Sequence, residues 1–330
     1  MNLSWVALGF LAVALAWPVP ILLARADWPT RAPGTALVLW QAVALAGGLS
    51  MIGALLSYGL MPFGNTPADG VVAFARYLLA SALPASASFG QMFALSGAVL
   101  LAVHLVLNLA LTFARAERSR QRHRQLVTLL SAPMPESPGL RIIDHEAPVA
   151  YCLPGTTRSV TVLSAGLFTL LDQQQLRAVI SHENAHATQR HHLVLVAFRA
   201  WRSSLPWFPI ATRALIAVTT LVEMLADDRA RRDVPDATLA RSIELVASAS
   251  ARSFFAETPM EKTASPRTGS PLTAQSRSAL AADGDSAHRR IERLVNPQPV
   301  LSSAGRVFAA ICGLALLAIP TAFLVMPIFA

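Results

Sequence analysis

Four long apolar stretches divide the chain. They cover Asn2–Ala24 and, approximately, Thr35–Met61, Phe89–Ala114 and Val307–Ala330. Each has at least the length of about 20 residues that a helix needs to cross a bilayer. The pattern therefore predicts four transmembrane helices. No basic residue precedes the apolar run of the first stretch, so we predict a span there rather than a cleaved signal peptide.

Between the third and fourth stretches the pattern changes to short strands and amphipathic helices. Strands are predicted at Leu140–Ile143, Val149–Leu153 and Ser159–Leu163, with a turn at Pro154–Gly155 between the last two. The segment Ser131–Pro138, rich in proline, is predicted to end the basic helix Arg115–Leu130 ahead of these strands. This section therefore has the pattern of a small α+β domain.

An amphipathic helix is predicted directly after Asp172. Asp172 and Gln175 have the spacing of a capping box. Leu176, Val179 and Ile180 then form an apolar stripe at helical spacing. The helix should bury this stripe and expose its other face.

The segment that follows is apolar but interrupted by arginines and prolines. Its apolar pieces have about 10 residues each, too few for a span. We predict a helical hairpin, Leu193–Trp201 and Thr212–Ala230, which lies against the domain or dips into the membrane face. Trp201, Trp207 and Phe208 at its turn suit a bilayer interface.

Beyond the hairpin, the chain is less informative. Helices are predicted at Asp236–Ser248 and Ala287–Val295. Between them, Ala251–Asp285 is rich in Ser, Thr, Ala and Pro and is predicted to be a linker, with a regulatory or self-cleaved segment as the alternative. The second helix should lead the chain back to the membrane.

Composition supports a membrane protein. The chain is 54% apolar and 14% charged, with a mean hydropathy of +0.48, and the charged share is well below the roughly 25% of ordinary soluble domains. The net charge of +8 comes almost entirely from arginine. Because the arginines cluster beside the apolar stretches, membrane topology explains them better than nucleic-acid binding, and no nucleic-acid partner is expected. Cys152 and Cys312 do not form a disulfide framework.

The arginines also predict an orientation. The loop with Arg25 and Arg31, and the basic helix Arg115–Leu130 that continues the third span, should face the cytoplasm. The two termini and the connection Pro62–Ser88 should then lie outside, and the domain after the third span should be cytoplasmic. We therefore predict a multi-pass protein of the cell membrane.

The third span contains two polar residues one helical turn apart. His104 and Asn108 should project from one face of this helix. Polar groups at membrane depth are candidates for function. A hydrogen bond between packed helices is the interpretation we favour.

The amphipathic helix carries the pattern H-E-x-x-H at His182–His186. His182 and His186 are separated by one helical turn, so both imidazoles can bind one Zn²⁺. Glu183 lies beside them and can accept a proton from the attacking water as a general base. Accidental occurrence is improbable in a chain with 8 histidines, so a metal site is favoured over a surface helix. The strand at Ser159–Leu163, just ahead, could be the edge that pairs with an extended substrate, or ordinary scaffolding.

A third ligand is needed, because a catalytic zinc usually takes three protein ligands and leaves one position open. Glu223 is the predicted third ligand, since an antiparallel second helix would return it to the metal; a solvated helix charge is the alternative. Asp227, one turn further, could accept a hydrogen bond from a ligand histidine and fix its tautomer. His191 and His192 are rivals as ligands, but a continuing first helix would carry them past the metal.

Four motifs give the chain a resemblance to a known family. Tyr151–Gly155, Ser164–Phe168, Leu176–His186 and Glu223–Asp227 resemble the BlaR/MecR-type membrane zinc metallopeptidases, especially their short forms. The resemblance implies His182, His186 and Glu223 as zinc ligands and Glu183 as general base. HtpX-like membrane proteases share the H-E-x-x-H and E-x-x-A-D motifs and are the near alternative.

Two departures from the BlaR/MecR pattern stand out. His191 occupies a position where these families commonly have Asp. The sequence also stops at Ala330, shortly after the last apolar stretch, so we expect no penicillin-binding sensor domain. A β-lactam sensor is not predicted.

The predicted fold is a mainly α integral membrane protein with a cytoplasmic α+β, zincin-like metallopeptidase domain between spans three and four. We expect three spans in 1–114, the zinc domain in 115–250, a linker and short helix in 251–303, and the fourth span in 304–330. The expected activity is zinc endopeptidase cleavage at the cytoplasmic face. The resemblance implies a BlaI/MecI-type transcriptional repressor as substrate. HtpX-like quality control, or a non-catalytic receptor with a structural metal, are the alternatives.

Overall fold

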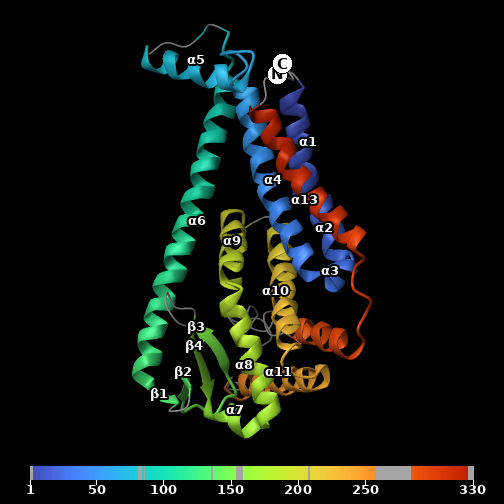
Figure 1. Cartoon of the computed structure of the whole chain (residues 1–330). Helices are drawn as coiled ribbons and strands as arrows, with labels where there is room; N and C mark the ends of the chain where they lie inside the picture. Colours follow the sequence, from blue (N-terminus) through green and yellow to red (C-terminus); the bar gives the residue numbers. More distant parts are fainter. Residues whose placement is uncertain are drawn as a thin grey trace, which may run out of the picture. The chain divides into compact units, whose positions relative to one another are not determined.

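The computed structural model describes residues 3–80, 84, 86–134, 137–153, 159–206, 209–257 and 284–325. Two compact units divide the chain. The first comprises Met1–Phe113, Ala197–Val218 and Val300–Ala330, and the second comprises Ala114–Val196 and Thr219–Pro299. Figure 1 shows the elements of both, and each unit is described by itself.

The first unit is entirely helical in its described residues. Four helical stretches are long and apolar enough to cross a membrane, and they lie where the sequence predicts spans: Ser4–Arg25, Pro33–Gly59, the apolar part of Phe89–Leu130, and Ser303–Val325. They are formed by α1 (Ser4–Ala16) with α2 (Pro18–Arg25), by α4 (Pro33–Gly59), by α6 (Phe89–Leu130) and by α13 (Ser303–Val325). These four stretches are compatible with a multi-pass membrane protein.

Helix α4 is the centre of this unit. Val43 and Ala46 of α4 are buried against Leu15 of α1 and against Leu316 and Leu317 of α13. The first candidate span is divided into two helices, because α1 ends at Ala16 and α2 begins at Pro18. Proline fits the first turn of a helix but not its interior. A short helix, α3 (Trp28–Arg31), leads from α2 to α4.

The connection Pro62–Ser88 contains a helix that the sequence analysis did not predict, α5 (Pro67–Leu79). The Thr66 hydroxyl caps it by accepting a hydrogen bond from the Asp69 N–H at 3.1 Å, and Pro67 occupies its first turn. This combination is a strong helix start. The connection Pro62–Ser88 has few charged residues, so its sequence does not show the alternation of polar and apolar positions that would predict α5.

The two polar residues of the third span bind the end of a neighbouring helix, α9 (His191–Ser204). The Asn108 side chain donates to the Ala200 carbonyl at 2.7 Å and to the Ser204 hydroxyl at 2.7 Å. His104 Nε2 lies 3.4 Å from the Ser204 carbonyl oxygen. The predicted hydrogen bonding between packed helices is confirmed.

The second unit contains a four-stranded sheet. Its strands are β1 (Ser131–Met134), β2 (Ser137–Ile143), β3 (Ala150–Leu153) and β4 (Val160–Ser164), in the order β1-β2-β4-β3. β2 and β4 are parallel, and the other two pairs are antiparallel. The substrate-edge hypothesis for Ser159–Leu163 is wrong, because β4 lies between β2 and β3, and the edges of the described sheet are β1 and β3.

Helix α6 ends at Leu130, where the segment Ser131–Pro138 is predicted to break it. Ser131–Met134 then pairs with β2 as an edge strand that was not predicted, in a position where proline is tolerated. The helix predicted to end at Ser248 is α11 (Asp236–Glu257), so the beginning of the predicted linker is helical. The predicted turn Pro154–Gly155, the residues Trp207 and Phe208, and residues 258–283 lie outside the described part of the chain.

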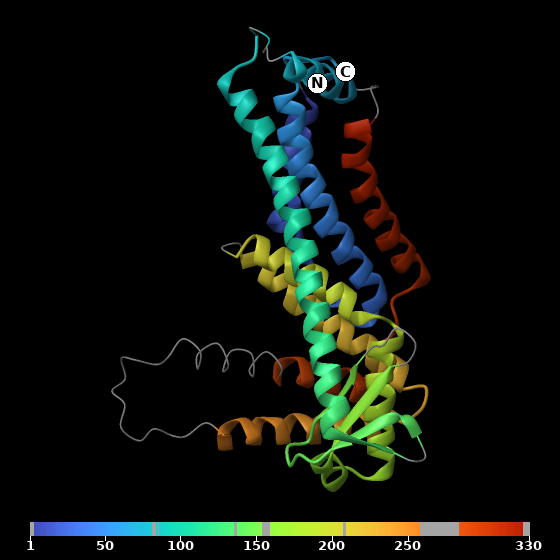
Figure 2. The same cartoon turned by 90° about the vertical axis from the view of Figure 1, so that its left-hand side faces the viewer.

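The sheet packs against α7 and α8, and the helices of this unit carry the site residues. They are α7 (Ala165–Leu170), α8 (Gln173–Thr188), the first part of α9, the second part of α10 (Pro209–Ala230), α11 and a helix over residues 284–295. Figure 2 shows the sheet and helices from the side, with the long α6 continuous through its whole range. Leu163 and Leu167 are fully buried in the core beneath α8.

The predicted capping box at the start of α8 is present. The Asp172 carboxylate accepts from the Gln175 N–H at 2.8 Å, and the Gln175 side-chain oxygen accepts from the Asp172 N–H at 3.0 Å. This box fixes where α8 begins. The direction of every later side chain on the helix follows from that start.

Candidate metal centre

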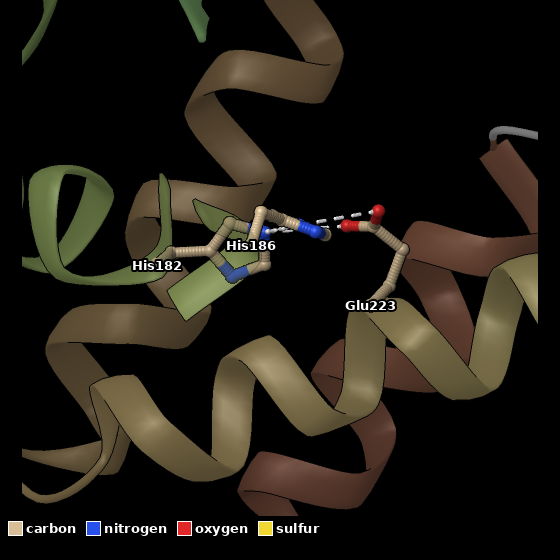
Figure 3. A group of neighbouring side chains, drawn as sticks. All are labelled: His182, His186 and Glu223. Carbon is tan, nitrogen blue, oxygen red and sulfur yellow. Dashed lines mark hydrogen bonds and ion pairs between the residues drawn. The ribbon is translucent and has the colours of Figure 1, made fainter. Parts of the chain in front are cut away.

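Helices α8 and α10 bring three metal-binding side chains together. His182 Nε2 lies 3.1 Å from His186 Nε2, because the two residues are one turn apart on α8. Glu223 of α10 places Oε2 3.2 Å from His182 Nε2 and Oε1 3.4 Å from His186 Nε2. Figure 3 shows the carboxylate pointing at the two imidazoles.

These distances fit a zinc ion. Zinc binds nitrogen and oxygen ligands at roughly 2.0–2.1 Å with tetrahedral geometry, so its ligand atoms stand about 3.3 Å apart. The two Nε2 atoms are 3.1 Å apart, one Glu223 oxygen lies 3.2 Å from the first and the other Glu223 oxygen lies 3.4 Å from the second, all close to that edge length. His182, His186 and Glu223 are therefore the residues that could hold the metal.

Asp227 orients one of the two histidines. Its Oδ1 lies 2.9 Å from His182 Nδ1, and the residue is only 1% exposed. A neutral His182 that donates its Nδ1 proton to this carboxylate keeps a lone pair on Nε2, the nitrogen that faces His186 and Glu223. The sequence prediction placed Asp227 one turn beyond Glu223 for this purpose.

Glu183 lies on α8 between the histidines and the sheet. Burial raises the pKa of its carboxyl, while the neighbouring His182 and His186 and a hydrogen bond from the Cys152 backbone N–H oppose the rise in pKa. Cys152 belongs to β3, an edge strand. The Glu183 carboxylate is therefore hydrogen-bonded to an edge strand of the sheet and is also close enough to His182 and His186 to feel their charge.

Residues 114–265 match the model of peptidase family M48. The matched range contains α8 and the residues His182, Glu183, His186, Glu223 and Asp227. No curated protein and no solved structure matches the chain. The M48 match supports a metallopeptidase, in agreement with the geometry of the site.

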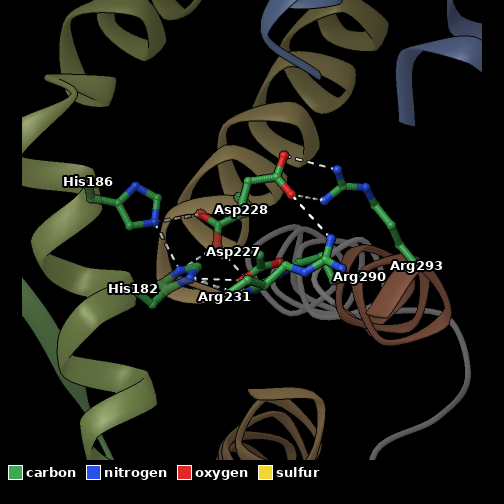
Figure 4. Close-up of polar contacts among 8 residues, drawn as sticks. His182, His186, Asp227, Asp228, Arg231, Arg290 and Arg293 are labelled. Atoms are coloured by element: carbon green, nitrogen blue, oxygen red, sulfur yellow. Dashed lines mark hydrogen bonds and ion pairs between the residues drawn. The ribbon is translucent and has the colours of Figure 1, made fainter. Parts of the chain in front are cut away.

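Arg290, which lies outside the M48 match, completes the polar group. Its Nε and Nη2 each donate to a different oxygen of Asp227 at 2.7 Å, and its Nη1 lies 3.1 Å from Glu223 Oε2. Figure 4 shows the guanidinium beside Asp227 and His182. The sequence analysis missed Arg290, because one arginine in a basic helix gives no signal of this contact.

The helix that carries Arg290 contacts α10 through an ion pair and α11 through apolar side chains. Arg293 makes a bidentate pair with Asp228, at 2.7 and 2.9 Å (Figure 4). On its apolar side, Leu294 is buried with Leu239 and other residues of α11. The position of Arg290 is therefore set by packing as well as by charge.

The charges of this group depend on one another. Burial alone would raise the pKa of Glu223 and of Asp227, but hydrogen bonds and the positive charge of Arg290 hold both pKa values below their ordinary range. Burial would lower the pKa of His182, yet its hydrogen bonds to Asp227 and Glu223 raise that pKa to about 9. Asp227 and Glu223 are thus two buried carboxylates whose negative charge is offset by Arg290 and by His182.

His191 lies beside the centre, contrary to the sequence prediction. A continuing helix would have carried His191 past the metal, but α8 ends at Thr188 and Arg190 has a positive φ of 52°. His191, 3% exposed, consequently places Nδ1 3.0 Å from His186 Nδ1. His192, the next residue, is not among the described metal-binding group.

Proposed function

We propose that the protein is a zinc endopeptidase of the cell membrane that cleaves a protein substrate at the cytoplasmic face. The observation that carries the proposal is that His182, His186 and Glu223 converge: the two Nε2 atoms are 3.1 Å apart, and the two Glu223 oxygens lie 3.2 and 3.4 Å from them. The M48 match over residues 114–265 supports the same reaction class. The alternative is a non-catalytic receptor with a structural metal, and measurements of zinc content and cleavage distinguish it from a peptidase.

Glu183, Asp227 and Arg290 have different roles in the proposed peptide hydrolysis. Zinc, when bound, acts as a Lewis acid and makes water a stronger nucleophile at neutral pH. Glu183 accepts the proton of the attacking water and returns it to the leaving amine. Asp227 holds His182 in the tautomer that leaves Nε2 free, and Arg290 balances the charge of Asp227.

The sheet supplies a place for the substrate. β3 is an edge strand of the described sheet, and the backbone N–H of its residue Cys152 bonds to Glu183. An extended peptide can add to such an edge through main-chain hydrogen bonds. The peptide would then pass beside Glu183, where the proton transfer takes place.

Metal content and cleavage together test the activity. The wild-type protein, purified in detergent, should hold about one zinc per chain and cleave an unstructured protein substrate, and chelation should abolish both. His186→Ala should lose zinc, whereas Glu183→Gln should retain zinc without cleavage. A zinc-bound, folded wild type that cleaves nothing, with Glu183→Gln silent in cells, would favour the receptor with a structural metal.

The orientation is proposed from the arginines beside the spans and needs its own test. Thr169 is exposed in the second unit. In a chain whose Cys152 and Cys312 are replaced by serine, Thr169→Cys should resist a membrane-impermeant thiol reagent in intact cells and react after lysis. Labelling in intact cells would place this unit outside the cytoplasm.

Two substrate classes follow from the resemblance. A BlaI/MecI-type repressor gives a signalling role, and many unrelated membrane proteins give an HtpX-like quality-control role. Cells that carry Glu183→Gln in place of the wild type separate them. Loss of cleavage of one DNA-binding repressor supports signalling, whereas accumulation of many membrane proteins supports quality control.

A further inference from the structure

The two ligand histidines have different partners on their second ring nitrogen. His182 Nδ1 faces the Asp227 carboxylate at 2.9 Å. His186 Nδ1 instead faces another imidazole, Nδ1 of His191, at 3.0 Å. The His186 and His191 rings meet edge to face, with centroids 5.0 Å apart and planes at 83°.

The backbone between α8 and α9 is shaped for this contact. Arg190 adopts φ 52°, and no other non-glycine residue in the described part of the chain has a positive φ. A left-handed conformation is unfavourable for a residue with a Cβ, and it is used here to end one helix and begin the next. His191, the first residue of α9, is thereby turned back onto His186 and buried.

The hydrogen bonds of His191 determine which of its nitrogens carries the proton. His191 Nε2 lies 2.8 Å from the side-chain oxygen of Gln189, which can only accept. A neutral His191 therefore donates from Nε2 and keeps its lone pair on Nδ1. That lone pair accepts the Nδ1 proton of His186, which leaves His186 Nε2 free to face Glu223 and His182.

We infer that His191 is a positioning residue for the metal centre, which fixes the tautomer and ring orientation of His186 through an imidazole-to-imidazole hydrogen bond. The inference rests on the proposed zinc function. Gln189 in turn fixes the tautomer of His191 by accepting a hydrogen bond from its Nε2. The centre is thus held by a carboxylate on one histidine and by a neutral imidazole on the other.

Metal affinity of purified, full-length variants tests the inference. His191→Leu removes the acceptor of the His186 proton, and loss of such a partner typically weakens metal binding about 10- to 100-fold. His191→Asp supplies a carboxylate acceptor at the same place and should restore the affinity. His192→Leu is the matched control, because its side chain is on the same helix turn and outside the metal-binding group; it should leave the affinity unchanged.

Cobalt gives a readout that a merely structural role would not change. The visible absorption of Co²⁺ in the site should alter in His191→Leu and return in His191→Asp. Gln189→Met, which leaves the backbone turn intact, should shift both affinity and spectrum in the same direction as His191→Leu and serves if that variant fails to fold. Wild-type affinity and an unchanged spectrum in folded His191→Leu or Gln189→Met would overturn the inference.

Failure of this inference and failure of the proposed function are distinguishable. A folded wild type that binds neither Zn²⁺ nor Co²⁺ removes the metallopeptidase itself. A wild type that binds both ions, with His191 variants that bind equally well, removes only the positioning role.

Discussion

Arg290 donates two hydrogen bonds of 2.7 Å to the carboxylate of Asp227, from Nε to Oδ2 and from Nη2 to Oδ1. The two residues are 63 positions apart in the sequence. Because Asp227 is 1% exposed and also faces His182, this bidentate pair neutralises a buried charge next to a candidate metal ligand. The carboxylate can therefore orient His182 without being left unpaired in the protein interior.

Removing this arginine should destabilise the second unit. Arg290→Met leaves Asp227 buried without its cation, and breaking such a pair costs about 3–5 kcal/mol of unfolding free energy. Denaturant unfolding of the metal-free protein measures the loss. The exposed neighbour Arg289→Met is the matched control and should change stability little.

A double variant checks the physical reason for that loss. Asp227→Asn combined with Arg290→Met removes both charges, so the double variant should be more stable than Arg290→Met alone. Additive losses would show that the pair is not coupled.

Glu183→Gln should lower the cleavage rate while zinc stays bound. A general base contributes about 10²- to 10⁴-fold to the rate, so a fall within or beyond that range is expected. The rate of peptide cleavage at saturating substrate and the zinc content measure the two effects. Glu292→Gln, which replaces an exposed glutamate, should leave both unchanged; comparable cleavage by the Glu183 variant would remove this residue from the mechanism.

Gly166 should tolerate no side chain. A Cβ at this position would lie 1.8 Å from the carbonyl oxygen of Glu146, a backbone atom that cannot rotate away. Gly166→Ala should therefore destabilise the second unit by about 3 kcal/mol, at the upper end of usual overpacking costs. Gly284→Ala, where nothing lies within 4 Å, provides the control in the same unfolding experiment.

Asn108→Ala should loosen the contact between α6 and α9. The variant loses hydrogen bonds to the Ala200 carbonyl and the Ser204 hydroxyl, and such interhelical bonds are worth about 1 kcal/mol in membrane proteins. Unfolding in detergent measures the effect, with the exposed Leu109→Ala as reference. Equal stability of Asn108→Ala and the wild type would count against this contact.

Periodicity explains which features the sequence could predict. Spans follow from apolar length, and His182 with His186 follows from helical spacing. Glu223 and Asp227 follow from one turn of a second helix, so the sequence alone places all four residues on two helix faces.

Three features of the structure have no periodic pattern in the sequence and could not be predicted from it. His191 depends on a positive φ at Arg190, and an arginine at that position gives no sign of a left-handed turn. Arg290 depends on the return of a distant helix, for which no short-range pattern exists. The identity of β3 as an edge strand depends on strand order, since β3 and β4 have similar lengths and both precede α8.

The distance in sequence between Asp227 and Arg290 has a consequence for biosynthesis. A ribosome finishes His182, His186, Glu223 and Asp227 well before it adds the arginine that pairs with Asp227. A nascent chain that ends before residue 290 thus carries the ligands of the centre with a buried aspartate that lacks its cation. Completion of the centre belongs to the last stage of translation, after the first three candidate spans have already been synthesised.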